Sequence, residues 1–476
     1  MTSVPSAPSE RHPDSTALSE RHASWLELFF DLIAVAGVAQ LAHLLHGSPG
    51  RADLGLYCLL YLAFWTAWMC FTTYGNVAAE KVHTRTVLVG MFGLAVMAAA
   101  VPGVRTDHAT AFALAYVIVR VLASRVWRRR GEVVADWPAA QVTAGVTPWF
   151  VSVWAEAPAR YWLWAAGLAV DLALTFARSR SQVLARAQKD WEEHEGSRAR
   201  NDGRARKREG RGSAGRGRGG SRTADAGQDG ARDGSGAGSE GPGKGGGPDR
   251  AGGGGRERGH DRASRPRPVA ARFDPGHLDE RLGLFTLIVL GEGIALGVEA
   301  ASEAEWDRGL CTMAVGSFAL LLSLWALAVR RSCGVPLLGF GVLAPRFALP
   351  LHCVSTGALA AVAASLGGAV EHAEGRLPHG MRWLLCGGIA VFLAVGLLAG
   401  VVSGRGTRWA LAAGLPMALA PLLLAVSAAD WSPATLVWSL VLVARWPWFY
   451  ERRTRRRSGT GAEDRPTGRR EEPEGA

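Results

Sequence analysis

The sequence predicts an all-α integral membrane protein with about twelve transmembrane helices, six before and six after a disordered cytoplasmic linker. Apolar residues make up 48% of the 476 residues, whereas the charged and glycine-rich residues gather in a few blocks. Long apolar stretches recur, each close to the roughly 20 residues that a helix needs to cross the hydrocarbon of a bilayer. The 60 glycines follow no three-residue period and the six cysteines form no CxxC pair. Collagen and disulfide-scaffold proteins are therefore excluded.

The apolar stretches fall into two halves. The first half contains 25–46, 54–73, 86–103, 109–127, 137–154 and 160–177, and the second contains 281–300, 309–329, 347–370, 382–402, 406–427 and 432–449. The weakest of them is 137–154, which contains Pro148. The predicted organisation is a polar N-terminal tail at 1–24, membrane halves at 25–177 and 277–449, a linker at 178–276 and a basic C-terminal tail at 450–476.

The distribution of Lys and Arg predicts the orientation. If the N-terminus is cytoplasmic, the inner short loops and tails contain eighteen of these residues and the outer loops six. Positively charged loops stay on the cytoplasmic side. We therefore expect a multi-pass protein of the cell membrane with both termini in the cytoplasm. The polar residues 1–24 do not resemble a cleavable signal peptide.

The segment 178–276 is predicted to be disordered. It carries 23 Lys and Arg against 14 Asp and Glu, and few aromatic or β-branched residues. Such a segment cannot bury enough apolar surface to fold. Arg218-Gly219-Gly220 resembles an RNA-binding RGG segment, but the interspersed acidic residues argue against nucleic acid as a partner. We expect the linker and the C-terminal tail to contact anionic lipid headgroups instead.

Charged residues inside the predicted spans are the best candidates for a functional site, because each costs ~2.5–3.5 kcal/mol near the middle of a helix. In the first span, Glu27 and Asp31 lie four residues apart and share a helix face. Glu27 is placed equally well at a solvated helix N-terminus, whereas Asp31 needs a buried partner. Gln40 and His43 form a second polar pair near the far end of this span.

The seventh span contains the other strong candidate, Glu292. It lies about 16 Å along the helix from Arg281 and on nearly the same face. Gly291 and Gly293 flank it and permit close helix approach or local unwinding. We expect Glu292 to bind a proton or a cation, and a buried salt bridge is the competing interpretation.

Four further polar residues have weaker signals. Arg120 is expected to extend toward the cytoplasmic face, because it ends an apolar run. Asp171 lies in the middle of a span and should pair with another helix. His352 either relays protons or is hydrogen-bonded within the bundle. His277 is expected at the cytoplasmic surface, where it caps the seventh span.

Motifs of soluble enzymes are missing from the sequence: there is no P-loop, HExxH or credible GxSxG. We therefore expect no enzyme, no catalytic residue, no metal site and no cofactor.

Two segments resemble the signatures of the bacterial low temperature requirement A protein family: LELFFDLIAVAGVAQLAHLL at 26–45 and HLDERLGLFTLIVLGEGIAL at 277–296. The resemblance implies a polytopic protein of the bacterial inner membrane, and the family name refers to growth in the cold. It implies these signature positions: Glu27, Phe29, Phe30, Asp31, Gln40, His43, His277, Glu280, Arg281, Gly283, Gly291 and Glu292. Gly293 departs from an expected serine, and of the acidic residues expected after Asn76 only Glu80 is present.

The leading functional hypothesis is a transporter or channel-like protein for an unknown small solute or ion. Asp31 and Glu292 would bind a proton or cation, assisted by His43 or His352. The alternative is a structural or regulatory membrane protein that supports growth in the cold without moving a solute. An intramembrane enzyme acting on lipid is a weaker third hypothesis, because no metal motif supports it.

Overall fold

The computed structural model describes residues 23–78, 82–130, 132–177, 180–216, 267–329, 343–373 and 375–459. The described chain divides into a unit with most of the helices, up to Leu184 and again from Val269, and a second unit at Ala185–Pro268. The predicted all-α membrane fold is confirmed. Most of the two terminal tails and much of the predicted linker lie outside the described residues.

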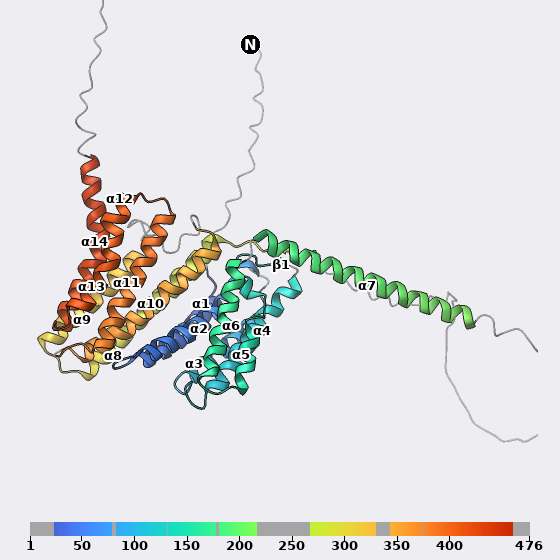
Figure 1. Cartoon of the computed structure of the whole chain (residues 1–476), viewed down its shortest axis with the longest axis horizontal. Helices are drawn as coiled ribbons and strands as arrows, with labels where there is room; N and C mark the ends of the chain where they lie inside the picture. The colour runs from blue at the N-terminus through green and yellow to red at the C-terminus, as the bar shows by residue number, and fades with distance from the viewer. Residues whose placement is uncertain are drawn as a thin grey trace, which may run out of the picture. The chain divides into compact units, whose positions relative to one another are not determined.

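The first half consists of helices joined by short turns (Figure 1). Its elements are α1 (Trp25–Ala42), η1 (His43–Leu45), α2 (Arg51–Ala78), α3 (Thr84–Ala100), α4 (Ala109–Arg130), η3 (Pro138–Ala140), α5 (Val146–Val151), η4 (Ser152–Trp154) and α6 (Ala159–Ala177).

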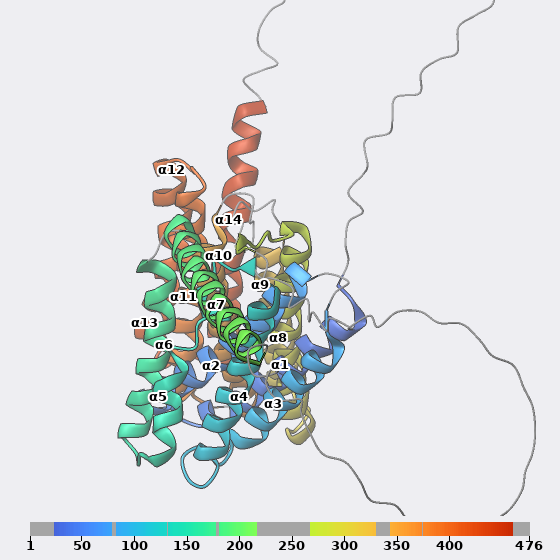
Figure 2. The ribbon, with the colours of Figure 1, turned by 90° about the vertical axis from the view of Figure 1, so that its right-hand side faces the viewer.

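The second half has longer helices, coloured yellow to red in Figure 1. They are α8 (Pro275–Glu303), α9 (Arg308–Val329), α10 (Pro345–Glu371), α11 (His379–Val402), α12 (Thr407–Trp409), the π-helical turn η6 (Ala410–Gly414), α13 (Leu415–Ser427) and α14 (Pro433–Gly459). The long helices of both halves run alongside one another (Figure 2).

Within the described residues, eight helical segments are long and apolar enough to cross a membrane. They are Trp25–Leu45, Arg51–Ala78, Ala109–Trp127, Pro275–Glu303, Arg308–Ala328, Pro345–Glu371, His379–Val402 and Thr407–Ser427. The predicted span 86–103 corresponds to the shorter apolar helix α3. The predicted spans 160–177 and 432–449 coincide with α6 and the first part of α14.

The predicted fifth span, 137–154, is not one helix. It consists of η3, the six-residue α5 and η4, with turns between η3 and α5. Trp137, Ala139 and Ala140 are buried against the neighbouring helices. Irregular backbone is tolerated at membrane depth when protein covers it, which explains how this stretch is accommodated.

The predicted disordered linker begins as a helix, α7 (Arg180–Arg216). Its sequence is rich in strong helix formers, and Lys189 and Glu193 form an i,i+4 ion pair at 3.9 Å. Such pairs stabilise a helix that has no apolar face. The two-residue strands β1 (Glu132–Val133) and β2 (Val269–Ala270) pair in parallel, so that the chain after this region lies beside the segment that follows α4.

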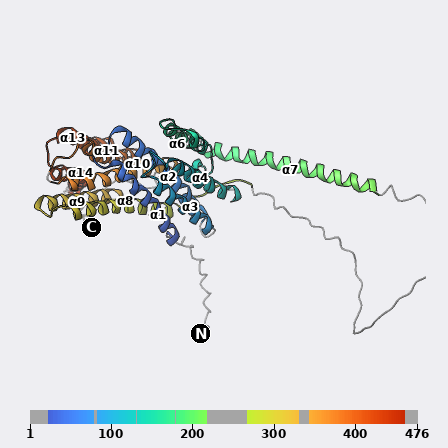
Figure 3. The same ribbon diagram turned by 90° about the horizontal axis from the view of Figure 1, so that it is seen from below.

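The two halves meet through α1 and α2 on one side and α8 and α10 on the other (Figure 3). Helix α10 is the most enclosed of the candidate spans, since 94% of its most apolar 18-residue stretch is buried. Small residues line it, so that neighbouring backbones approach closely. A Cβ atom on Gly357 would lie 2.8 Å from the Tyr61 ring of α2. The polar residues at this junction form the candidate site.

Candidate functional site

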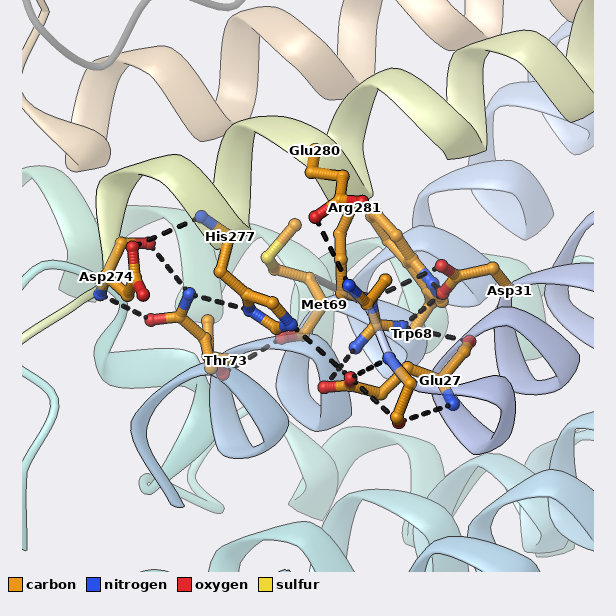
Figure 4. A network of polar contacts seen from close by, with 12 residues as sticks. Glu27, Asp31, Trp68, Met69, Thr73, Asp274, His277, Glu280 and Arg281 are labelled. Carbon is orange, nitrogen blue, oxygen red and sulfur yellow. Dashed lines mark hydrogen bonds and ion pairs between the residues drawn. The ribbon is translucent and has the colours of Figure 1, made fainter. Parts of the chain in front are cut away.

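Arg281 of α8 lies between two carboxylates of α1 at the junction of the halves (Figure 4). Its guanidinium forms an ion pair with Asp31, in which Nε lies 3.3 Å from Oδ2. Its Nη1 lies 3.5 Å from Glu27 Oε1. Asp31 is 0% exposed and Arg281 1%. One buried guanidinium therefore serves two acidic side chains.

Glu27 has a second role at the start of α1. Ser24 and Glu27 form a capping box, in which the Ser24 N–H donates to Glu27 Oε2 at 2.9 Å and the Glu27 N–H donates to Ser24 Oγ at 3.3 Å. This arrangement satisfies backbone donors that a helix start leaves unpaired. The same carboxylate therefore fixes the first turn of α1 and faces Arg281.

His277 supplies the third contact to Glu27. Its Nε2 lies 3.3 Å from Glu27 Oε2, and the ring is buried. The prediction that His277 caps its helix at the surface is wrong, because the cap is Asp274. The Asp274 Oδ1 accepts hydrogen bonds from the N–H groups of Gly276 and His277 at 3.0 and 3.2 Å.

Asn76 of α2 is hydrogen-bonded to Asp274 at the start of α8 and to the His277 ring. Its Oδ1 accepts from the Asp274 N–H at 2.9 Å, and its Nδ2 donates to the Asp274 carbonyl at 2.9 Å. With the amide oriented in this way, Nδ2 faces His277 Nδ1 at 3.2 Å. A donor opposite Nδ1 requires that nitrogen to accept. His277 Nδ1 therefore accepts from Asn76, and Nε2 faces Glu27 as the donor.

Two residues of α2 complete the enclosure of the carboxylates. Trp68 Nε1 donates to Asp31 Oδ1 at 2.7 Å. Gly75 lies against Glu27, and a Cβ atom there would be 2.6 Å from Glu27 Oε1. The Glu27–Asp31–His277–Arg281 cluster, hereafter the acidic cluster, therefore has walls from α1, α2 and α8.

The chain matches the model of one known protein family. A model of the bacterial low temperature requirement A protein (LtrA) family matches residues 22–195 and 260–445, more than half of the chain. The chain belongs to the LtrA family. No curated protein and no solved structure matches this LtrA protein.

The two signature segments of the LtrA protein meet at the acidic cluster. The first contributes Glu27 and Asp31, and the second contributes His277 and Arg281. Of the other signature positions, Glu280 accepts a hydrogen bond from the Ala23 N–H at 3.2 Å. Phe30 is buried in the core, whereas Phe29 is exposed. Gly283 and Gly291 have open space where a Cβ atom would lie.

A second buried ion pair joins Arg120 of α4 to Asp171 of α6 at 2.8 Å. Arg120 also donates to Cys70 Sγ at 2.7 Å and to the Ala139 carbonyl. The prediction that Arg120 extends to the cytoplasmic face is therefore wrong, since it is 1% exposed. Arg120 of α4 therefore connects the irregular segment 137–154 with α2 and α6.

His352 of α10 is hydrogen-bonded on both ring nitrogens. Its Nδ1 accepts from Trp65 Nε1 at 3.1 Å, so the proton is on Nε2. Nε2 lies 3.2 Å from the Leu282 carbonyl and 3.5 Å from Thr286 Oγ1. His352 therefore links α10 to α2 and α8.

Glu292 is separate from the acidic cluster. It is half-buried, and its charge interacts with that of Glu299 on the same helix and, more weakly, with His43 at the end of α1. His43 itself stacks on His46 with ring centroids 5.3 Å apart. Gly293 allows α8 to approach α10 closely, since a Cβ atom on Gly293 would lie 2.9 Å from the Ala363 Cβ.

Helix α8 continues through this region without unwinding. The Gln40 side chain lies partly exposed near the same end of α1.

Sequence reasoning missed Asn76, Asp274, Trp68 and Gly75. One signal was present. Residues 57, 61, 65, 68, 72 and 76 recur every three or four positions and carry Tyr, Tyr, Trp, Trp, Thr and Asn. That spacing puts them on one face of α2.

Proposed function

We propose that this LtrA protein is a transporter or channel-like protein of the bacterial inner membrane, and that the acidic cluster binds the proton or cation that it moves. The observation that carries this proposal is the sharing of Arg281 by Glu27 and Asp31. Two carboxylates that compete for one buried guanidinium repel each other. Protonation of one of them leaves the other with a complete ion pair, so the cluster has two states that differ by one proton.

The position of the cluster supports the proposal. Charged groups inside a membrane are costly, and those that persist commonly mark ion or proton pathways. The cluster lies between α1 of one half and α8 of the other. Transporters with two helical halves bind their ions at such an interface. A catalytic role has no comparable support, and we do not propose an enzyme.

The test is ion flux in liposomes. Wild type and Asp31→Asn are reconstituted, and proton, Na⁺ and K⁺ movements are followed under imposed gradients. We expect wild type to move at least one of these ions and Asp31→Asn to lose that flux, because Asn cannot carry a negative charge. Asp430→Asn is the matched control, since Asp430 pairs with Arg376 at 3.1 Å on the exposed surface. Absence of all flux in wild type, or full flux in a folded Asp31→Asn, would contradict the proposal.

Glu292→Gln belongs in the same experiment. Glu292 lies half-buried in a candidate span, and a second ion-binding position there predicts reduced flux in the folded variant. Unchanged flux would restrict the site to the acidic cluster.

A structural role is the second candidate function. The ion pairs of Glu27 and Asp31 with Arg281 fasten α1 to α8 and so connect the two halves. If this fastening is their whole purpose, neutralising Asp31 lowers the amount of folded protein, and wild type moves no ion.

A further inference from the structure

One face of α2 is polar over the thickness of a membrane. Tyr57 and Asn76, at its two ends, are nineteen residues apart, which corresponds to about 28 Å of helix. The hydrocarbon core is about 30 Å thick. The side chains between them on this face are Tyr61, Trp65, Trp68 and Thr72, and none of the six is more than 4% exposed.

The partners of this face are polar along most of its length. At one end, Tyr57 OH donates to the Gly357 carbonyl and Tyr61 OH bonds Thr356 Oγ1, both at 2.7 Å. At the other end, Asn76 reaches His277 of the acidic cluster. The face therefore connects the acidic cluster with the opposite side of the bundle.

The indoles of Trp65 and Trp68 interrupt this row of polar side chains between Asp31 and His352. The Trp65 and Trp68 ring centroids lie 6.3 Å apart, and Phe285 packs on Trp68 at 4.2 Å. An indole N–H donates but cannot accept, so it cannot relay a proton. Each indole is bonded to a proton acceptor: Trp68 to Asp31 Oδ1 at 2.7 Å and Trp65 to His352 Nδ1 at 3.1 Å.

We propose that the transported species is a proton, that it travels along this face of α2, and that Trp65 and Trp68 form the gate on its route. This inference rests on the proposed function of the acidic cluster. A closed column of hydroxyl and imidazole groups suits a proton better than a metal ion. Among the described residues no group of three or more His, Cys, Asp and Glu side chains is arranged to hold a metal.

Protonation of either acceptor releases its indole. A proton that binds Asp31 converts the carboxylate to a carboxylic acid, which weakens the acceptor of the Trp68 N–H. A proton that binds His352 Nδ1 gives an imidazolium with donors on both nitrogens, so Trp65 loses its acceptor. Transfer breaks the O–H bond on Asp31 and forms the N–H bond on His352, through water that enters where the indoles stood.

The surroundings of the two acceptors are different. Asp31 faces Arg281 of α8 and Trp68 of α2, and shares α1 with Glu27. His352 faces Trp65 and Trp68 of α2, and Phe285 and Thr286 of α8. Asp31 is therefore the charged acceptor and His352 the neutral one.

Phenylalanine substitutions test the gate, because they keep an aromatic ring and remove the N–H. A hydrogen bond to a neutral acceptor contributes ~0.5–1.5 kcal/mol and one to a charged acceptor ~1.5–3 kcal/mol. We therefore expect proton flux in liposomes to rise about two- to tenfold in Trp65→Phe and tenfold or more in Trp68→Phe. Trp164→Phe is the matched control, since its buried Nε1 donates to Ser152 Oγ at 2.7 Å away from this face.

The His352→Gln variant and measurements of Na⁺ and K⁺ flux distinguish gate opening from a general leak. His352→Gln keeps an acceptor for Trp65 but cannot take up a proton, and we expect it to lose flux while remaining folded. Na⁺ and K⁺ flux should not rise in any variant, which distinguishes gate opening from a general leak. Unchanged proton flux in both folded Phe variants, or wild type that moves Na⁺ or K⁺ but no protons, would overturn the inference and leave the proposed function standing. Wild type that moves no ion would overturn both.

Discussion

Gly75 provides the space in which the Glu27 carboxylate lies. A Cβ atom at this position would be 2.6 Å from Glu27 Oε1 and 3.4 Å from Arg281 Nη1. We expect Gly75→Ala to lower the free energy of unfolding by about 1–3 kcal/mol, because the ion pair must move or be strained. Thermal unfolding in detergent measures the change.

Gly55→Ala in the same helix is the control. Nothing lies within 4 Å of the Cβ atom it would add, and Ala favours a helix over Gly by about 1 kcal/mol. This variant should be as stable as wild type or slightly more stable. Equal stability of the Gly75 and Gly55 variants would contradict the packing described for Glu27.

The pairing of Asp31 illustrates what one sequence can predict about single residues. A carboxylate between Phe30 and Leu32 in an apolar span requires a buried partner, and this requirement is visible in the sequence. The identity of the partner is not visible, because Arg281 is 250 positions away and one sequence does not show which distant residues are in contact. The roles of Arg120 and His277 were missed for the same reason.

At the level of elements, the Arg120–Asp171 pair holds the irregular segment between α4 and α6. Asp171→Asn leaves Arg120 buried with the Ala139 carbonyl and Cys70 as neighbours. Breaking a buried ion pair on one side costs about 3–5 kcal/mol, so we expect a correspondingly lower unfolding midpoint. Asp430→Asn, in an exposed pair with Arg376, should not change the midpoint measurably. A stable Asp171→Asn would mean that packing alone supports this segment.

Most elements were predictable, because apolar length identifies helices that cross a bilayer. The fifth span was not, since its apolar composition fits buried irregular chain as well as helix. Composition also failed for α7, where charges at helical spacing stabilise a segment without a core. Helix starts carry local signals that could have been used: Ser24 with Glu27, and Asp274 before Pro275.

For the whole molecule, the orientation in the membrane is the main prediction from charge. Ser48 follows α1 and is exposed, and Thr407, also exposed, begins α12. In a background without the native cysteines, we expect Ser48→Cys to react with a membrane-impermeant maleimide applied to intact cells. Thr407→Cys should react only after the membrane is opened. The reverse pattern would place the termini outside.

Infrared spectroscopy tests the sharing of Arg281 by two carboxylates most directly. If Glu27 and Asp31 compete for one guanidinium, one of them takes up a proton as the pH falls while the other keeps the ion pair. The carbonyl stretch band of that carboxylic acid should therefore appear in wild type on acidification. Removing either competitor leaves the other in a complete ion pair with Arg281. We therefore expect the band to require a lower pH in both Asp31→Asn and Glu27→Gln, and to appear at the wild-type pH in Asp430→Asn. A band at the wild-type pH in either cluster variant, or no band in wild type at any pH, would contradict the sharing of Arg281.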